Sequence, residues 1–166
     1  MPNEPKEPKA NNTNQEANAI NPNARHNARR YLVQAMYQWQ VAHTPINDLE
    51  HEFLRYHIEK KADLEFFKEL LHGIPKHQQE IDAEMQPFLA RSLSEIDPIE
   101  LAVLRVAIYE LIKRPDIPYR VIINEALQLT KKFGSIEGYK FVNGILDRIA
   151  KKNRATEINM RKDNPT

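Results

Sequence analysis

The segment IPYRVIINEALQLTKKFGSIEGYKFVNGILDRIA, residues 117–150, carries the clearest fold signal in this 166-residue chain. On either side of Gly134, apolar residues recur every three or four positions. They are Ile122, Ala126, Leu129 and Phe133 before the glycine, and Val142, Ile145, Leu146 and Ile149 after it. This spacing gathers the apolar side chains on one helix face, and glycine is typical just past a helix end. The segment therefore predicts two amphipathic helices joined by a tight turn.

The turn between these two predicted helices is basic and aromatic. Lys131 and Lys132 precede it, and Lys140 and Phe141 follow it. Cations contact phosphates and aromatic rings stack on bases, so this combination is typical of surfaces that bind single-stranded nucleic acid. The alternative for Phe141 is a place at the edge of the core, since it precedes the apolar position Val142 by one residue.

The remainder of the folded chain also has helical periodicity, and no segment alternates as a strand does. The apolar repeats span residues 32–39, 49–56, 64–85 and 103–111. Gly73 and Pro75 predict a kink or break within the third of these. The fourth follows Asp97-Pro98-Ile99-Glu100, which has the order of an N-cap, a first-turn proline and a capping-box glutamate. Its apolar residues cover more than one face, so we expect a central, buried helix.

The two ends of the chain differ in composition from the part between them. Residues 1–23 are rich in proline and asparagine and nearly lack large apolar residues, and residues 154–166 are similarly polar. Such segments cannot bury enough apolar surface to fold alone. We expect disordered tails at both ends and one folded unit at 24–153, with subdomains of about 24–90 and 91–153.

Composition also limits the functional classes. The chain has no cysteine, which excludes disulfides and thiolate metal sites. His72 and His77 are five residues apart, not the four that align metal ligands on a helix, and no HExxH, GxSxG or glycine-rich phosphate loop occurs. No apolar run approaches the ~20 residues of a membrane span, and we find no signal-peptide pattern. We therefore expect no enzyme, metal or cofactor, and a cytoplasmic protein.

Charge is distributed unevenly despite a net charge of +1. Residues 46–100 contain thirteen acidic and six basic residues, whereas residues 131–154 contain seven basic and two acidic. Arg25, Arg29 and Arg30 lie near the start of the first predicted helix, where cations oppose the helix dipole. We expect a basic face for phosphate and an acidic face for a basic protein. The alternative is a solvated surface of mixed charge.

Four segments together resemble the NusB family of bacterial transcription antitermination factors. They are ARRYLVQAMYQWQ (28–40), IELAVLRVAIYEL (99–111), IPYRVIINEALQLTKKFG (117–134) and KFVNGILDRIA (140–150). The resemblance runs in order from about residue 24 to 151. It implies an all-α fold of about six to seven helices in two small packed bundles.

The resemblance also implies a function without catalysis. Proteins of this family bind the boxA element of nascent RNA together with NusE, a small-subunit ribosomal protein, and join the RNA polymerase antitermination complex in ribosomal RNA operons. The positions implied to bind RNA are Arg25, Arg29, Glu137, Lys140 and Phe141. Those implied to face the partner protein are Tyr37 and Glu100. His26 and Asn27 interrupt an arginine run that is denser in relatives.

Two other functions remain open at this point. A NusB-like module also precedes the catalytic domain of certain ribosomal RNA cytosine methyltransferases, although no methyltransferase segment follows here. The chain could instead be a structural helical homodimer, because some relatives self-associate.

Overall fold

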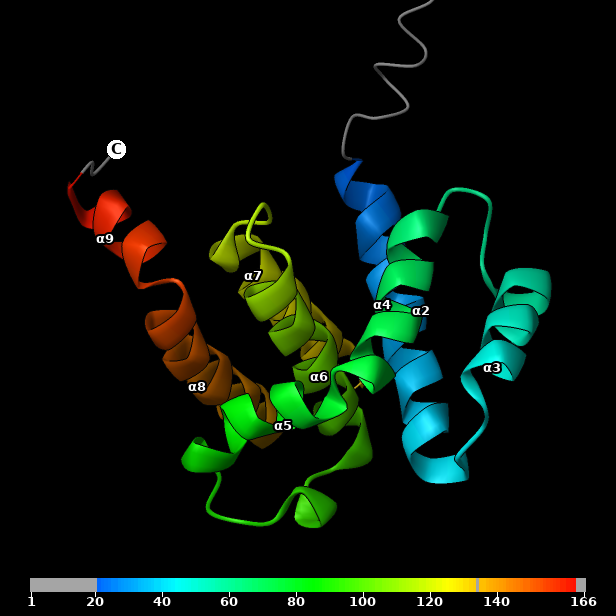
Figure 1. Cartoon of the computed structure of the whole chain (residues 1–166), viewed down its shortest axis with the longest axis horizontal. Helices are drawn as coiled ribbons and strands as arrows, with labels where there is room; N and C mark the ends of the chain where they lie inside the picture. Colours follow the sequence, from blue (N-terminus) through cyan, green and yellow to red (C-terminus); the bar gives the residue numbers. More distant parts are fainter. Residues whose placement is uncertain (1–20, 134, 164–166) are drawn as a thin grey trace, which may run out of the picture.

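The computed structural model describes residues 21–133 and 135–163, and in these ranges the secondary structure is helical throughout (Figure 1). Eight α-helices form the fold: α2 (Pro22–Ala42), α3 (Ile46–Glu52), α4 (Leu64–Lys76), α5 (Gln78–Met85), α6 (Pro98–Lys113), α7 (Tyr119–Phe133), α8 (Ile136–Asn153) and α9 (Ala155–Asp163). A π-helical turn, Phe53–His57, follows α3, and two 3₁₀ turns, Gln86–Phe88 and Leu93–Glu95, connect α5 to α6. The all-α prediction is confirmed, with one helix more than the upper count expected.

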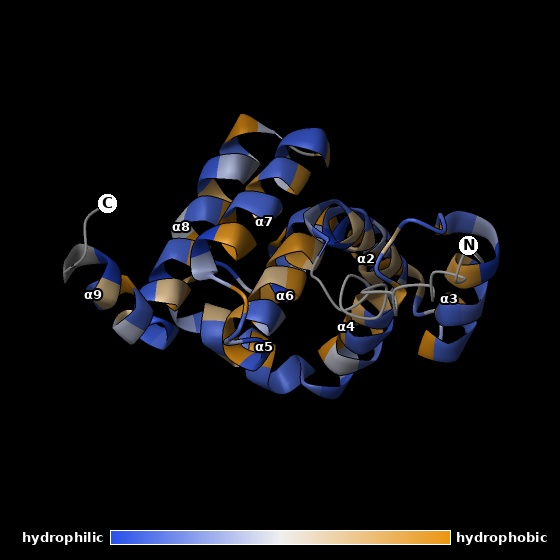
Figure 2. Ribbon diagram, turned by 90° about the horizontal axis from the view of Figure 1, so that it is seen from above, coloured by the Kyte–Doolittle hydropathy of each residue, from blue (hydrophilic) through white to orange (hydrophobic). Residues whose placement is uncertain are grey.

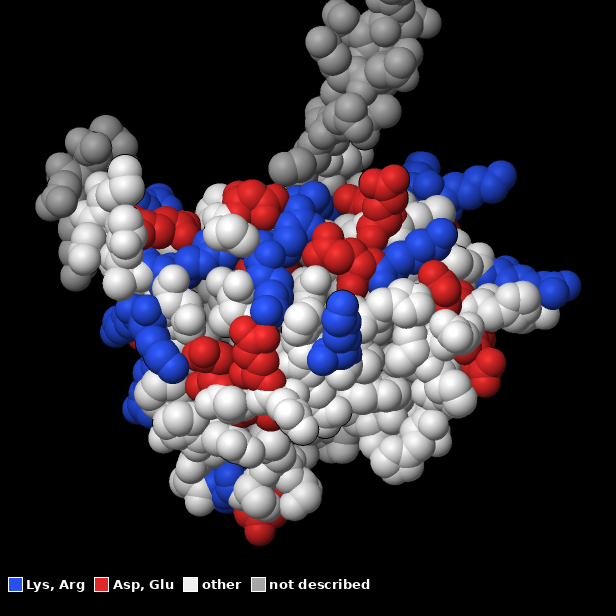
Figure 3. Space-filling view, viewed as in Figure 1, with Lys and Arg blue, Asp and Glu red and all other residues white. Residues whose placement is uncertain are grey.

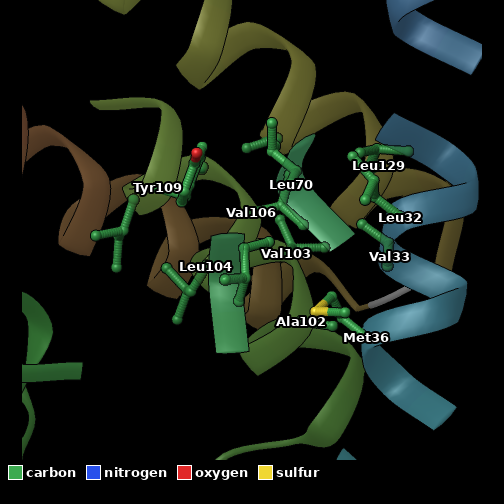
Figure 4. Close-up of a cluster of buried hydrophobic side chains, with 14 of the residues drawn as sticks. Leu32, Val33, Met36, Leu70, Ala102, Val103, Leu104, Val106, Tyr109 and Leu129 are labelled. Carbon is green, nitrogen blue, oxygen red and sulfur yellow. The ribbon is translucent and has the colours of Figure 1, made fainter. Parts of the chain in front are cut away.

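Helix α6 lies at the centre of the fold. Asp97 caps it by accepting hydrogen bonds from the backbone N–H groups of Ile99 and Glu100, at 2.9 and 3.1 Å. Every residue from Leu101 to Leu111 is buried. The helix packs against α2, α4, α5, α7 and α8, and Figure 4 shows its side chains meeting those of α2, α4 and α7. The prediction of a buried central helix is confirmed, and the buried apolar residues form one cluster.

The helices that pack against α6 carry apolar and polar residues on different sides, as the colours of Figure 2 show for α7 and α8. The predicted break in the third apolar repeat falls at His77, between α4 and α5, two residues after Pro75. Gly73 allows α4 to approach α6 closely, since a Cβ atom there would lie 2.6 Å from Cε2 of Tyr109. A larger residue at this position would displace the Tyr109 ring.

The C-terminal segment differs from its expectation, because α9 occupies residues where we expected a disordered tail. Arg154 is buried and donates hydrogen bonds to four backbone carbonyl oxygens around the α6–α7 connection, those of Glu110, Leu111, Arg114 and Ile117. Glu157 of α9 accepts from Arg154 and from the Tyr119 backbone N–H. One buried arginine thus anchors a helix whose composition is polar.

The N-terminal boundary shifts slightly. Asn21 caps α2, which begins at Pro22, two residues before the expected start. Residues 1–20 lie outside the described residues, so the disordered tail remains a prediction there, and so does the role of Gly134. No helix in the described part of the chain is both long and apolar enough to cross a membrane.

Candidate nucleic-acid interface

The first two turns of α8 hold three of the residues assigned to RNA. Ser135 caps the helix, its hydroxyl accepting from the Gly138 backbone N–H at 3.0 Å. Glu137 and Lys140 are exposed, whereas Phe141 is half-buried and packs against the core. The ring therefore lies at the edge of the core, and its stacking on RNA stays a prediction.

Phe141 and Lys140 line a hollow of about 300 Å³ between α8 and the segment that follows α5. Phe88 and Arg91 line it from that segment, and Arg148 lines it from α8. The Arg148 guanidinium lies over the Phe88 ring, 5.9 Å from its centroid. Two aromatic rings and three cations therefore surround one depression.

Phe88, Arg91 and Arg148 were not predicted from the sequence to lie beside Phe141. Arg148 had a signal, since it follows Phe141 by seven residues and so shares its helix face. Phe88 and Arg91 had no such signal, because they lie in the short connection between α5 and α6, whose position depends on the tertiary fold.

The basic and aromatic surface continues onto the end of α7. The ammonium group of Lys131 lies 5.1 Å from the ring centroid of Tyr139, and that of Lys132 lies 5.7 Å from the centroid of Phe133. Cations at such distances are attracted to the ring faces. The structure therefore brings together the two sides of the turn, as the sequence predicted.

Arg29 contradicts the expectation that it is exposed. Its side chain is only 3% accessible and donates three hydrogen bonds of 2.7–3.2 Å to the carboxylate of Glu110, which is 1% accessible. Burial raises the pKa of Glu110, and Arg29 opposes that rise. The guanidinium of Arg29 is paired with Glu110 and almost inaccessible. Arg29 therefore stabilises the fold and is not positioned to contact a phosphate.

Arg25 is more accessible than Arg29 but also has protein contacts. Its Nε lies 3.4 Å from Oδ2 of Asp63, and its guanidinium lies 5.0 Å from the centroid of the Phe66 ring. The neighbouring His26 contacts Glu125 of α7 through Nδ1. The start of α2 is thus a network of ion pairs.

Arg25 and Arg29 lie apart from the hollow beside α8. Arg29 binds Glu110, and the start of α8 lies against Glu100. Glu100 and Glu110 are ten residues apart on α6, and ten residues of α-helix span about 15 Å. On the face in Figure 3, blue and red side chains are interspersed over the upper part of the molecule, and an uncharged area lies below. The start of α2 does not add to a basic face as expected, because Asp63, Glu110 and Glu125 pair with its arginines.

Of the residues assigned to a partner protein, Tyr37 lies on α2 and Glu100 lies against the start of α8. Tyr37 of α2 is 41% exposed and borders a hollow of about 150 Å³ with Ile99 and Phe133. Val41, one turn further along α2, is 50% exposed. Two apolar side chains on the outer face of one helix can bind an apolar surface.

Glu100 lies at the amino end of α6. It is half-buried, and its carboxylate lies against Gly138 of α8. Burial and the nearby Asp97 raise the pKa of Glu100, while Arg91 opposes this. The capping-box prediction is confirmed for Asp97 and Pro98, but the Glu100 side chain turns toward α8.

No group of three histidine or acidic side chains in the described ranges could hold a metal ion. The arrangement can instead bind a chain of phosphates and unstacked bases, through cations that neutralise phosphate charge and rings that stack. It also offers an adjacent apolar and acidic surface.

Comparison with known proteins matches residues 26–151 to the model of the NusB family. The chain is 47% identical over 135 residues to the transcription antitermination protein NusB of Shewanella halifaxensis, covering 81% of this chain and 100% of that protein. It is also similar to the T. maritima NusB structure, with a TM-score of 0.68, 33% identity and coverage of 77% and 91% of the two chains.

A second solved structure is that of antitermination factors NusB and NusE in complex with dsRNA. A chain in it matches with a TM-score of 0.66 and 28% identity, and the match covers 76% of this chain and 96% of that one. Sequence and structure agree over the same central region. This chain therefore belongs to the NusB family.

Proposed function

We propose that this protein is a transcription antitermination factor that binds boxA RNA together with NusE and supports transcription of ribosomal RNA by RNA polymerase. It acts by binding and not by catalysis, in the cytoplasm. The observation that carries the proposal is the α8 hollow, where the rings of Phe88 and Phe141 lie among Arg91, Lys140 and Arg148. Family membership supports the same role.

Each component of the hollow suits single-stranded RNA. Stacking on an aromatic ring contributes ~1–3 kcal/mol per base and tolerates different bases. The three cations can contact the phosphates on either side. Glu137, an exposed acid beside them, can accept hydrogen bonds from base amino groups, which selects among bases. Arg25 provides a second, weaker contact at the other end of α6.

The partner surface is proposed to be the outer face of α2 at Tyr37 and Val41, with Glu100 beside it. Ribosomal proteins are basic, so an acidic group next to an apolar strip suits such a partner. The contact of Glu100 with Gly138 links the two proposed surfaces. An RNA bound in the α8 hollow and a protein bound on α2 would therefore be neighbours.

Titration of a fluorescent boxA RNA tests the proposal, with a scrambled RNA as control, in the absence and presence of NusE. We expect tighter binding of boxA than of the scrambled RNA, and tighter binding still with NusE. Lys140→Ala should reduce the slope of log affinity against log salt by about one. The control Lys68→Ala, an exposed lysine of α4, should leave the slope unchanged. Equal affinity for both RNAs, with or without NusE, would refute the proposal.

A further inference from the structure

Glu100 connects the proposed partner surface to the proposed RNA surface. It belongs to the first turn of α6, yet a Cβ atom added to Gly138, in the first turn of α8, would overlap its Oε1 atom. The same Cβ would lie 3.3 Å from Oγ of Ser135, the hydroxyl that caps α8. A carboxylate from one helix therefore occupies the space at the amino end of another.

This position matters because the amino end of a helix favours negative charge. Its first N–H groups and the helix dipole attract anions within the first turn. Glu100 supplies that negative charge from within the protein. A phosphate that approaches Lys140 or Phe141 consequently meets a carboxylate of its own sign.

Glu100 also affects the hollow itself. Arg91, which lines the hollow, acts on the charge of Glu100 and holds down a pKa that burial raises. The interaction is mutual, so Glu100 weakens the positive potential that Arg91 offers to RNA. The carboxylate thus opposes phosphate binding at both α8 and Arg91.

We propose that Glu100 is an electrostatic gate on RNA binding, which a basic partner protein opens. A cationic side chain of the partner that pairs with Glu100 neutralises the carboxylate beside Gly138, and the affinity of the α8 hollow for phosphates rises. The inference rests on the proposed function and adds the route by which its two ligands are coupled. Both ligands favour a neutralised carboxylate, so each strengthens binding of the other by the same factor.

Two variants test the gate by different means. Glu100→Gln keeps the shape of the side chain and removes its charge. Gly138→Ala keeps the charge and places a methyl group where the Glu100 carboxylate lies, which displaces the carboxylate from the amino end of α8. The affinity of each variant for boxA RNA is measured by fluorescence anisotropy, first alone and then with saturating NusE.

We expect both variants to bind RNA alone about two- to fivefold more tightly than the parent, the range for one charge at a helix end. The gain that NusE gives should shrink by the same factor. Glu65→Gln, at an exposed position on α4, changes the net charge equally and should behave as the parent. Gly144→Ala, whose added Cβ meets nothing within 4 Å, shows in a thermal melt what an extra methyl group in α8 does to stability alone.

The outcomes are distinct. If Glu100→Gln binds RNA alone no more tightly than the parent, the gate is refuted, and a loss of NusE affinity would then make Glu100 a partner contact only. If Gly138→Ala does not fold, the RNA affinity of Glu100→Gln alone still tests the gate. If the parent binds neither RNA nor NusE, the proposed function fails before the gate is tested.

Discussion

Arg29→Ala should destabilise the protein strongly and leave RNA binding by the folded protein nearly unchanged. The substitution removes three hydrogen bonds and leaves the carboxylate of Glu110 buried without its cation. Breaking a buried ion pair from one side costs ~3–5 kcal/mol. For a folded unit of this size, where each kcal/mol shifts the melting temperature by ~3 °C, the expected loss is about 9–15 °C.

Urea denaturation, beside RNA titration well below the melting temperature, measures the two effects separately. The double variant Arg29→Met with Glu110→Leu should recover most of the lost stability, because apolar residues of similar volume often replace a buried pair without loss. An Arg29→Ala variant that melts like the parent but loses RNA affinity would refute the burial argument. Arg29 would then be the phosphate contact that the family resemblance implied.

The stability deficit of Arg29→Ala should also depend on pH. Burial already raises the pKa of Glu110 in the parent, and the variant loses the arginine that opposes this rise. An acid whose pKa is higher in the folded state favours folding below its unfolded pKa, and this contribution is lost as pH rises through the folded value. The deficit should therefore narrow toward pH 4 and widen toward neutral pH. Equal deficits at both would show that Glu110 does not titrate differently in the variant.

Three further substitutions probe the remaining assignments. Phe141→Ala should cost ~1–2 kcal/mol of stability, less than the ~3–5 kcal/mol of a fully buried phenylalanine, and ~1–3 kcal/mol of RNA affinity; a larger stability loss without an RNA effect would place the ring in the core. Glu137→Gln should tighten RNA binding about twofold and reduce the preference for boxA over scrambled RNA, and unaltered titrations would remove Glu137 from the surface. Arg154→Ala should lower the free energy of unfolding by ~2–3 kcal/mol, and the backbone amides of α9 should then exchange with solvent before those of α6. Simultaneous exchange of the two helices would contradict the role of Arg154 as an anchor.

The sequence predicted the fold well where local signals agree with burial. The apolar pattern and the Asp97-Pro98 cap both indicated the central helix, and α6 begins there. The sequence did not predict α9, because its stability depends on Arg154 reaching carbonyl oxygens more than thirty positions earlier in the chain. Composition reports what a segment can bury by itself, and such anchoring is a property of the assembled fold.

The candidate site was also predicted only where its residues are close together in the sequence. Lys140 and Phe141 share the start of one helix, so local periodicity was enough to place them together. Phe88 and Arg91 enter the hollow from the connection between α5 and α6, where Phe88 ends a short 3₁₀ turn, and no periodic pattern assigns their side chains a direction. The burial of Arg29 depends on a residue 81 positions away.

That last error was nevertheless detectable from the sequence. Glu110 lies in a run from Leu101 to Leu111 that is otherwise almost wholly apolar, and a carboxylate in such a helix needs a cation to offset its loss of water. The number of arginines near the start of the first helix therefore does not by itself indicate a phosphate site, because buried acids can bind some of these arginines. In the described part of the chain, no ion pair involves Lys140 or Arg148, whereas Arg29 and Arg105 are bound to Glu110 and Asp82. Lys140 and Arg148 therefore keep their charges available for a phosphate, and both line the hollow beside Phe141.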